Sequence, residues 1–198
     1  REALSEGNLK ATSTASNALS SSTILFPSST KWYFEALQVS GTSTTANIFG
    51  VFGRAEYRDN SSSTVSIVVD GSTVTTSISG FDAGDILGMA LDTSTGDFEF
   101  FKNGSSIYSG TSSLGFVNQP ANFYQSASGL THIFNFGQDS SFAGNKTPQG
   151  NTDDNGVGDF YYSPPSGYLA LCTANLPDPA IDPAQDDVPA DYFNTVLY

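Results

Sequence analysis

The sequence predicts an all-β protein. Short apolar runs alternate with Gly, Ser, Thr, Asn and Asp along most of the 198 residues, which is the pattern of strands separated by turns. No segment keeps a helical apolar period over three turns, and the best helical pattern, residues 2–12, is short. The 15 Phe and 9 Tyr residues supply the volume of a core, so a domain of this size needs no disulfide to fold.

The first clear strand covers residues 31–39, KWYFEALQV. Successive side chains of a strand point to opposite faces, so Trp32 and Phe34 share one face while Tyr33 and Glu35 share the other. This strand therefore presents apolar side chains on both of its faces.

Glycines mark the next segments. Gly50 lies inside the apolar run 46–58, where an internal glycine indicates a bulge or the close approach of another backbone. Asp70-Gly71 separates two runs rich in β-branched residues, which is the strongest hairpin signal in the chain.

Five further strands complete the pattern. Residues 85–110 predict three strands, joined first by a turn at 93–96 and then by the Asn-Gly pair at 103–104. Residues 121–128 and 130–137 predict two more.

Changes in residue composition divide the chain into four parts. We expect a lead-in at 1–19, a sandwich at 20–142, and an extension at 143–177 that packs on the sandwich. Within the extension, residues 160–165 (FYYSPP) are expected to cover an edge of the sandwich. Residues 178–198 begin with a Pro-rich linker and end with the start of a further segment.

Charge and cysteine content exclude several classes of function. Seven Lys and Arg residues face 20 Asp and Glu residues, for a net charge of -13. Nucleic acids and anionic membrane surfaces require clustered basic residues, so neither is expected as a partner. One Cys residue excludes an internal disulfide framework and a metal site built from several cysteines.

Three segments together resemble a SPRY domain. They are KWYFEALQV at 31–39, GDILGMALDTSTGDFEFFKNGSSIYSG at 84–110, and FNFGQDSSF at 134–142. The resemblance implies a concanavalin-like antiparallel β-sandwich of two sheets, with an irregular C-terminal extension. The chain shows no RING-type cysteines and no coiled coil, so ubiquitin-ligase targeting is not carried over.

The extension resembles a segment that follows SPRY-like domains in virion proteins of tailed bacteriophages, marine ones especially. The matching residues are GDFYYSPPSGYLALCTANLPDPAI at 158–181. In such proteins the segment leads into further fibre or virion domains, and YFNTVLY at 192–198 looks like the opening of one.

Two reactive residue types occur once each. His132 shares a strand face with Phe134 and would need a nucleophile or an acid beside it to act as a base. We interpret it as a hydrogen-bonded strand residue. Cys172 lies in an acidic stretch that does not favour a thiolate, and we interpret it as a small buried apolar residue.

Carboxylates are numerous, but their spacing does not match a glycosidase strand. Three pairs could flank a sugar: Asp82 with Asp85, Asp92 with Asp97, and Asp153 with Asp154. None of the five glutamates, however, forms the pattern Glu-x-Asp-x-x-Glu (Glu2, Glu6, Glu35, Glu56 and Glu99). We therefore predict no catalytic residue and no enzyme activity.

The string NTDDNGVGD at 151–159 resembles the first half of an EF-hand loop. The twelfth position is Tyr162 where a bidentate glutamate is required, so an EF-hand is excluded. Either a looser cation site or a polar Asx-turn loop is consistent with the string. We predict no metal ligand, no cofactor-binding residue and no cofactor.

Aromatic residues near strand ends could stack on sugar rings, and the alternative is that they belong to the core and its rim. These residues are Tyr57, Tyr108, Phe123, Tyr124, Tyr161 and Tyr162.

The sequence thus predicts a non-catalytic virion structural or adhesion module, part of a phage tail fibre or surface appendage. Its partners would be other virion proteins and a host surface glycan or protein, in a homo-oligomer for which a trimer is expected, on the surface of the extracellular particle. The alternatives are a capsid decoration or spacer protein, a carbohydrate-active enzyme of the concanavalin-like class, and a cellular SPRY adaptor.

Overall fold

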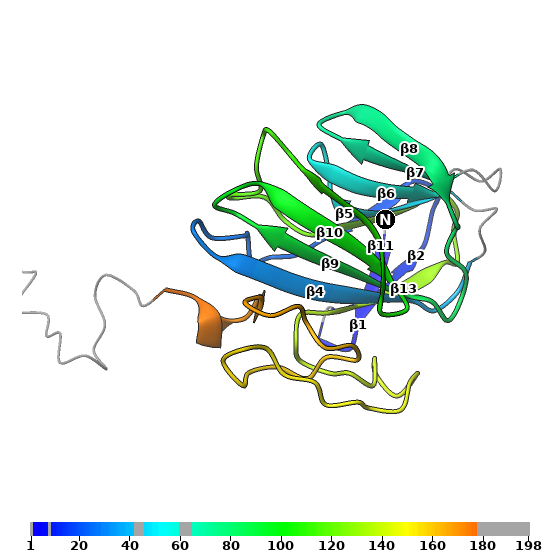
Figure 1. Cartoon of the computed structure of the whole chain (residues 1–198). Coiled ribbons are helices and arrows are strands. Elements are labelled where there is room, and N and C mark those ends of the chain that lie inside the picture. The colour runs from blue at the N-terminus through cyan, green and yellow to red at the C-terminus, as the bar shows by residue number, and fades with distance from the viewer. Residues whose placement is uncertain (1, 8, 42–45, 60–64, 178–198) are drawn as a thin grey trace, which may run out of the picture.

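The computed structural model describes residues 2–7, 9–41, 46–59 and 65–177. They form two antiparallel sheets packed face to face (Figure 1), so the predicted all-β sandwich with an irregular C-terminal extension is confirmed. The segment 178–198, expected as a linker and the start of a further segment, lies outside the described residues.

Sheet A has eight strands and sheet B has six. The order in sheet A is β1 (Glu2–Ser5), β2 (Lys10–Ser13), β13 (Thr131–Asn135), β4 (Lys31–Gln38), β9 (Ile86–Asp92), β10 (Asp97–Lys102) and β11 (Ser105–Thr111), with β14 (Leu169–Ala170) parallel to β4. The order in sheet B is β3 (Ala18–Ser21), β12 (Asn122–Gln125), β5 (Asn47–Val51), β6 (Ala55–Asp59), β7 (Val65–Val69) and β8 (Ser72–Ile78). A 3-10 turn, η1 (Thr173–Asn175), follows β14.

Aromatic side chains fill the space between the sheets. Phe34 of β4 contacts Phe49 of β5, with ring centroids 5.3 Å apart, and Phe49 in turn contacts Phe100 and Phe123. All four are fully buried. Truncating one such ring to alanine typically costs about 3–5 kcal/mol, so this row of phenylalanines is a main source of stability.

The predicted hairpins form with the expected turns. Asp70 and Gly71 join β7 to β8 with φ values of 49° and 80°, and Asn103 and Gly104 join β10 to β11 with φ values of 50° and 77°. Positive φ at both central residues is what a two-residue type I′ turn requires. Gly50 is explained by a close approach, because a Cβ there would lie 2.4 Å from the backbone oxygen of Ala55.

The helical pattern at residues 2–12 is wrong, because this stretch forms β1 and β2. Strand β2 pairs with β13, and β3 pairs with β12 of the other sheet. The helical pattern of residues 2–12 is weak. The backbone groups of these short strands instead form hydrogen bonds with the strands at the sheet edges, and this pairing decides their structure.

The extension covers the outer face of sheet A, not an edge strand as expected for residues 160–165 (Figure 1). Phe160 packs edge-to-face on Tyr33 at 5.2 Å, and Tyr161 packs against a second cluster that contains Leu37 and Ile86. The outer face of β4 is apolar, so the extension removes more apolar surface from water there than it would at an edge strand.

Among the described residues, no helix has the length and the apolar character needed to cross a membrane.

Candidate functional site

A buried carboxylate positions the part of the extension that carries two adjacent tyrosines. Glu35 of β4 is fully buried on the outer face of sheet A. Its Oε2 accepts the backbone N–H of Tyr161 at 2.9 Å and its Oε1 accepts that of Tyr162 at 2.8 Å. The hydroxyl of Tyr33 and the side-chain amide of Asn135 also donate to it, at 3.1 and 3.2 Å. The carboxylate thereby fixes the chain at 161–162 on the sheet.

Burial raises the pKa of Glu35 to about 7, although all four donors favour the ionised form and act in the opposite direction. Burial also raises the pKa of Tyr33 well above its usual value, and the neighbouring Glu35 adds to the effect. The role of Glu35 is not assigned by sequence reasoning. An acidic residue between Tyr33 and Leu37 on an apolar face is nevertheless a signal of a buried, bonded carboxylate.

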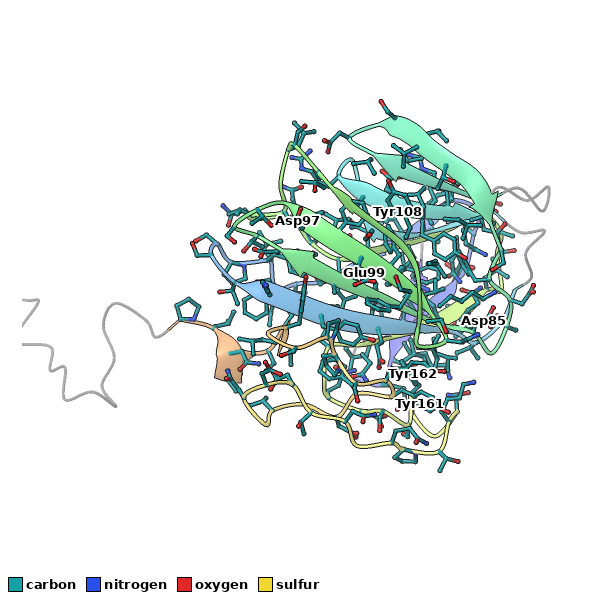
Figure 2. All side chains as sticks on the ribbon, in the orientation of Figure 1. Asp85, Asp97, Glu99, Tyr108, Tyr161 and Tyr162 are labelled. Atoms are coloured by element: carbon teal, nitrogen blue, oxygen red, sulfur yellow. The ribbon has the colours of Figure 1, made fainter. Side chains whose placement is uncertain are left out.

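Tyr161 and Tyr162 form an aromatic pair at the tip of the β10–β11 hairpin (Figure 2). Their rings are nearly perpendicular, with centroids 5.0 Å apart, and both are partly exposed. The Tyr162 ring lies directly over Gly104, where a Cβ would come within 2.6 Å of ring atom Cδ1. Gly104 therefore has two roles: it adopts the positive φ that the turn requires, and its lack of a side chain leaves room for the Tyr162 ring.

Polar groups are bonded to one another at the same hairpin turn. Asp85 accepts hydrogen bonds from the Asn103 side chain at 2.7 Å and from Lys102 Nζ at 3.0 Å. Burial acts to raise the pKa of Asp85, but the backbone N–H of Asp82 together with Asn103 and Lys102 lowers it below its usual value, so Asp85 is ionised at neutral pH. Lys146 Nζ donates to the backbone oxygen of Gly84 at 2.7 Å. The tip thus combines aromatic faces with fixed charges and amides, the chemistry that recognises a sugar or a polar protein surface. We call Tyr161, Tyr162, Asp85, Asn103 and Lys146 the aromatic tip.

The other aromatic candidates do not join this group. Tyr57 and Phe123 are fully buried in the core. Tyr108 packs against Phe98 at 5.9 Å, and Tyr124 lies on sheet B, where its hydroxyl donates to Asn17 at 2.5 Å. The structure therefore brings together two of the six aromatic residues.

His132 is a hydrogen-bonded strand residue, as interpreted. It is buried, stacked on Phe123 at 4.2 Å, and its Nε2 lies 2.7 Å from Ser20 Oγ. Ser20 also donates to Glu2 at 3.0 Å, and Nδ1 of His132 has no partner among the described residues. In a Ser-His-Asp triad the carboxylate orients that second ring nitrogen, whereas here the carboxylate bonds the serine.

Burial lowers the pKa of His132 to about 3, which makes it a weak base at neutral pH. The Glu2–Ser20–His132 chain is therefore a structural hydrogen-bond network rather than an activated nucleophile. Sequence reasoning misses it, because Ser20 and His132 are 112 residues apart.

Cys172 differs from the expectation. It is partly exposed, not buried, because it lies beyond the end of the short strand β14 and directly precedes the turn η1. Its sulfur lies 3.8 Å from the side-chain nitrogen of Asn175.

The loop at 151–159 has the bonds of an Asx-turn. Asp153 Oδ1 accepts the backbone N–H groups of Asn155 and Val157, both at 2.9 Å. Its Oδ2 accepts the N–H of Ala170 at 2.8 Å and the side chain of Asn175 at 2.7 Å. The Asp153 carboxylate thus ties the loop to β14 and η1. No group of three His, Cys, Asp or Glu residues in the described ranges is arranged to hold a metal ion.

The carboxylates of the pair Asp92 and Asp97 accept hydrogen bonds from nearby backbone and hydroxyl groups. Asp92 accepts the backbone N–H and the hydroxyl of Ser94, and Asp97 accepts the hydroxyls of Thr95 and Thr111. These bonds lower the pKa of both carboxyls; burial opposes them, and at Asp92 it is the largest single influence.

The sequence matches no protein-family model, and no curated protein matches it. The structure is similar to solved SPRY domains. The SPRY domain of human HERC1 aligns with a TM-score of 0.55 at 15% identity, over 67% of this chain and 91% of that domain. A second human SPRY domain aligns with a TM-score of 0.52 at 11% identity, over 67% of this chain and 93% of that domain.

The chain therefore has the SPRY-like, concanavalin-like fold, and this part of the sequence resemblance is confirmed. At such low identity the likeness concerns the fold alone, because one fold serves many unrelated functions. The bacteriophage context remains a prediction.

Proposed function

We propose that this chain is a non-catalytic adhesion module of a virion surface, part of a phage tail fibre or comparable appendage, and that it binds a host surface glycan through the aromatic tip. The observation that carries the proposal is the pair Tyr161 and Tyr162, held partly exposed beside Asp85 and Asn103.

The rings are suited to binding because they are fixed before a ligand arrives. Glu35 holds the backbone of both tyrosines, and Gly104 supports the ring of Tyr162. A side chain that is already ordered loses little entropy on binding, so stacking against a sugar ring yields more net affinity. Tyrosine also offers a hydroxyl for the sugar's own hydroxyl groups.

The context is proposed from the sequence. The segment 158–181, which contains the aromatic tip's tyrosines, resembles a segment of phage virion proteins. A homotrimer would present three tips, and weak single-site binding would then become strong through avidity. Sedimentation of the purified chain as a trimer is the expected result, and sedimentation as a monomer would remove this part of the proposal.

A glycan array tests the proposed ligand class. We expect the purified chain to bind a restricted set of glycans, and the double variant Tyr161→Ala, Tyr162→Ala to lose about tenfold or more in affinity. Tyr124→Ala is the matched control, because it removes a partly exposed tyrosine from the opposite sheet. No signal on the array, together with a position on the capsid, would favour a decoration or spacer protein. Release of shortened sugars would identify an enzyme.

A further inference from the structure

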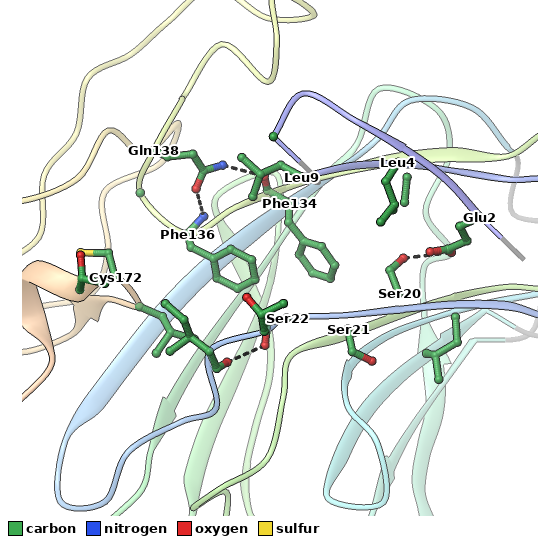
Figure 3. Close-up of a pocket in the computed structure, with 18 residues that line it drawn as sticks. Glu2, Leu4, Leu9, Ser20, Ser21, Ser22, Phe134, Phe136, Gln138 and Cys172 are labelled. Atoms are coloured by element: carbon green, nitrogen blue, oxygen red, sulfur yellow. Dashed lines mark hydrogen bonds between the residues drawn. The ribbon is translucent and has the colours of Figure 1, made fainter.

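A cavity separate from the aromatic tip lies between the two sheets. Its volume is about 630 Å³, and it opens where the edge strands β1 and β3 diverge (Figure 3). A volume within about 300–1,000 Å³ is typical of sites for small organic molecules.

The walls of the cavity are mainly apolar. Leu9, Phe134, Phe136 and Leu171 line it. At its rim Leu4 is 53% exposed and Leu19 is 51% exposed. Two large aliphatic side chains in water beside an apolar cavity mark a surface that gains free energy when an apolar molecule covers it.

Among the described residues that line the cavity, Glu2 is the acidic one and lies at one end, whereas neutral polar side chains such as Gln138 lie elsewhere along it. Figure 3 shows Glu2 and Ser20 at one end and Cys172 at the other. Ser20 Oγ donates to Glu2 Oε1 at 3.0 Å and lies 2.7 Å from His132 Nε2. A serine hydroxyl has a single proton, so when it donates to Glu2 it accepts from the imidazole. Glu2 lines the cavity, so its carboxylate can accept a hydrogen bond from a ligand there. Within the described ranges, no Lys, Arg or His residue lines the cavity.

We propose that this cavity binds an amphiphile with an apolar chain and a cationic, hydrogen-bond-donating head group, of which a long-chain primary amine is the simplest example. The chain would lie along Leu9, Phe134 and Phe136, and the ammonium group would bond Glu2. A fatty acid fits the walls equally well, but its carboxylate would meet Glu2 with no basic residue to compensate. The net charge of -13 further disfavours an anion.

The single cysteine reports on occupancy, because Cys172 lines the far end of the cavity and is partly exposed. The test compares decylamine, decanol and decanoate, each below its micelle-forming concentration, as protectants of Cys172 against a thiol reagent. We expect decylamine to protect at a concentration about tenfold or more below that required for decanoate, with decanol between them. Butylamine, which is too short to span the cavity, should not protect.

Variants separate specific binding from general attraction to an acidic protein. Glu2→Gln should abolish the preference for amine over decanol, whereas Glu99→Gln, the same change on the outer face of sheet A, should preserve it. Thr23→Trp places an indole where an exposed residue lines the cavity, and it should weaken all three ligands. Ser28→Trp, in the same connection but outside the cavity, should weaken none.

Three outcomes would overturn the proposal: decanoate protecting as well as decylamine, Glu2→Gln and Glu99→Gln behaving alike, or Thr23→Trp binding like Ser28→Trp. Cys172 is partly buried, so a general loss of folding would speed its labelling without any ligand and cannot imitate protection. Glycan binding at the aromatic tip plays no part in these measurements.

Discussion

Replacing Glu35 by Gln should change how the stability of this protein depends on pH. Burial holds the pKa of Glu35 at about 7 in the folded chain, against an ordinary value of 4.5. Between these two values the folded chain binds a proton that the unfolded chain releases. The contribution of Glu35 to stability is therefore complete below pH 4.5, declines as the pH rises to 7, and stays constant above that.

The size of the effect follows from the two pKa values. Each pH unit between them is worth about 1.4 kcal/mol, so the full decline is about 3 kcal/mol. Gln does not titrate, and it also places an amide nitrogen against one of the N–H donors of Tyr161 and Tyr162. That mismatch costs about 1–3 kcal/mol at every pH.

Urea unfolding followed by the fluorescence of the single, buried Trp32 measures the free energy of unfolding. The free energy of the unsubstituted protein minus that of Glu35→Gln should fall by about 3 kcal/mol from about pH 5 to about pH 8. Taking the difference removes the other carboxyls, such as Asp85, that titrate in both proteins. A difference independent of pH would refute the reasoning. A difference that rises with pH would show that the four donors outweigh burial.

Two further predictions concern buried polar groups. Proton NMR of the single histidine should show His132 neutral down to about pH 4, because burial lowers its pKa to about 3; a midpoint near its usual value of 6.5 would contradict the buried stack on Phe123. Since the unfolded chain takes up that proton first, His132 should also promote unfolding in acid. Asp153→Ala should lower the free energy of unfolding by about 2–3 kcal/mol, because it leaves the N–H groups of loop 151–159 and of Ala170 without an acceptor. The control is Asp154→Ala, at an exposed neighbouring residue, which should lower the free energy of unfolding by less than half as much. Equal decreases for the two variants, measured by urea unfolding, would contradict the role given to Asp153 in the Asx-turn.

The sandwich was predictable where a strand carries its own signal. Alternation in β4 places Phe34 in the core, and the Asp70-Gly71 and Asn103-Gly104 pairs fix hairpins through positive φ values. These signals are local, so a sequence displays them directly.

The remaining features depend on partners distant in the sequence. Strands β1 to β3 are short and weakly apolar, and pairing with β13 and β12 decides their structure. Glu35 meets the amide of Tyr161 across 126 residues. The sequence indicates Tyr161 and Tyr162 as two of six candidate stacking residues, but no pattern of nearby residues encodes the contacts that place these two beside Asp85 and Asn103.

The most direct test of glycan binding at the aromatic tip compares two glycine substitutions. Gly104→Ala and Gly71→Ala both place a methyl group at a positive φ in a hairpin turn, at 77° and 80°. The Gly104 methyl would strike the ring of Tyr162, whereas the Gly71 methyl meets nothing within 4 Å. For a glycan identified on the array, titration should show Gly71→Ala within about twofold of the unsubstituted protein and Gly104→Ala about tenfold weaker. Equal affinities for the two variants would contradict the claim that Tyr162 carries the binding.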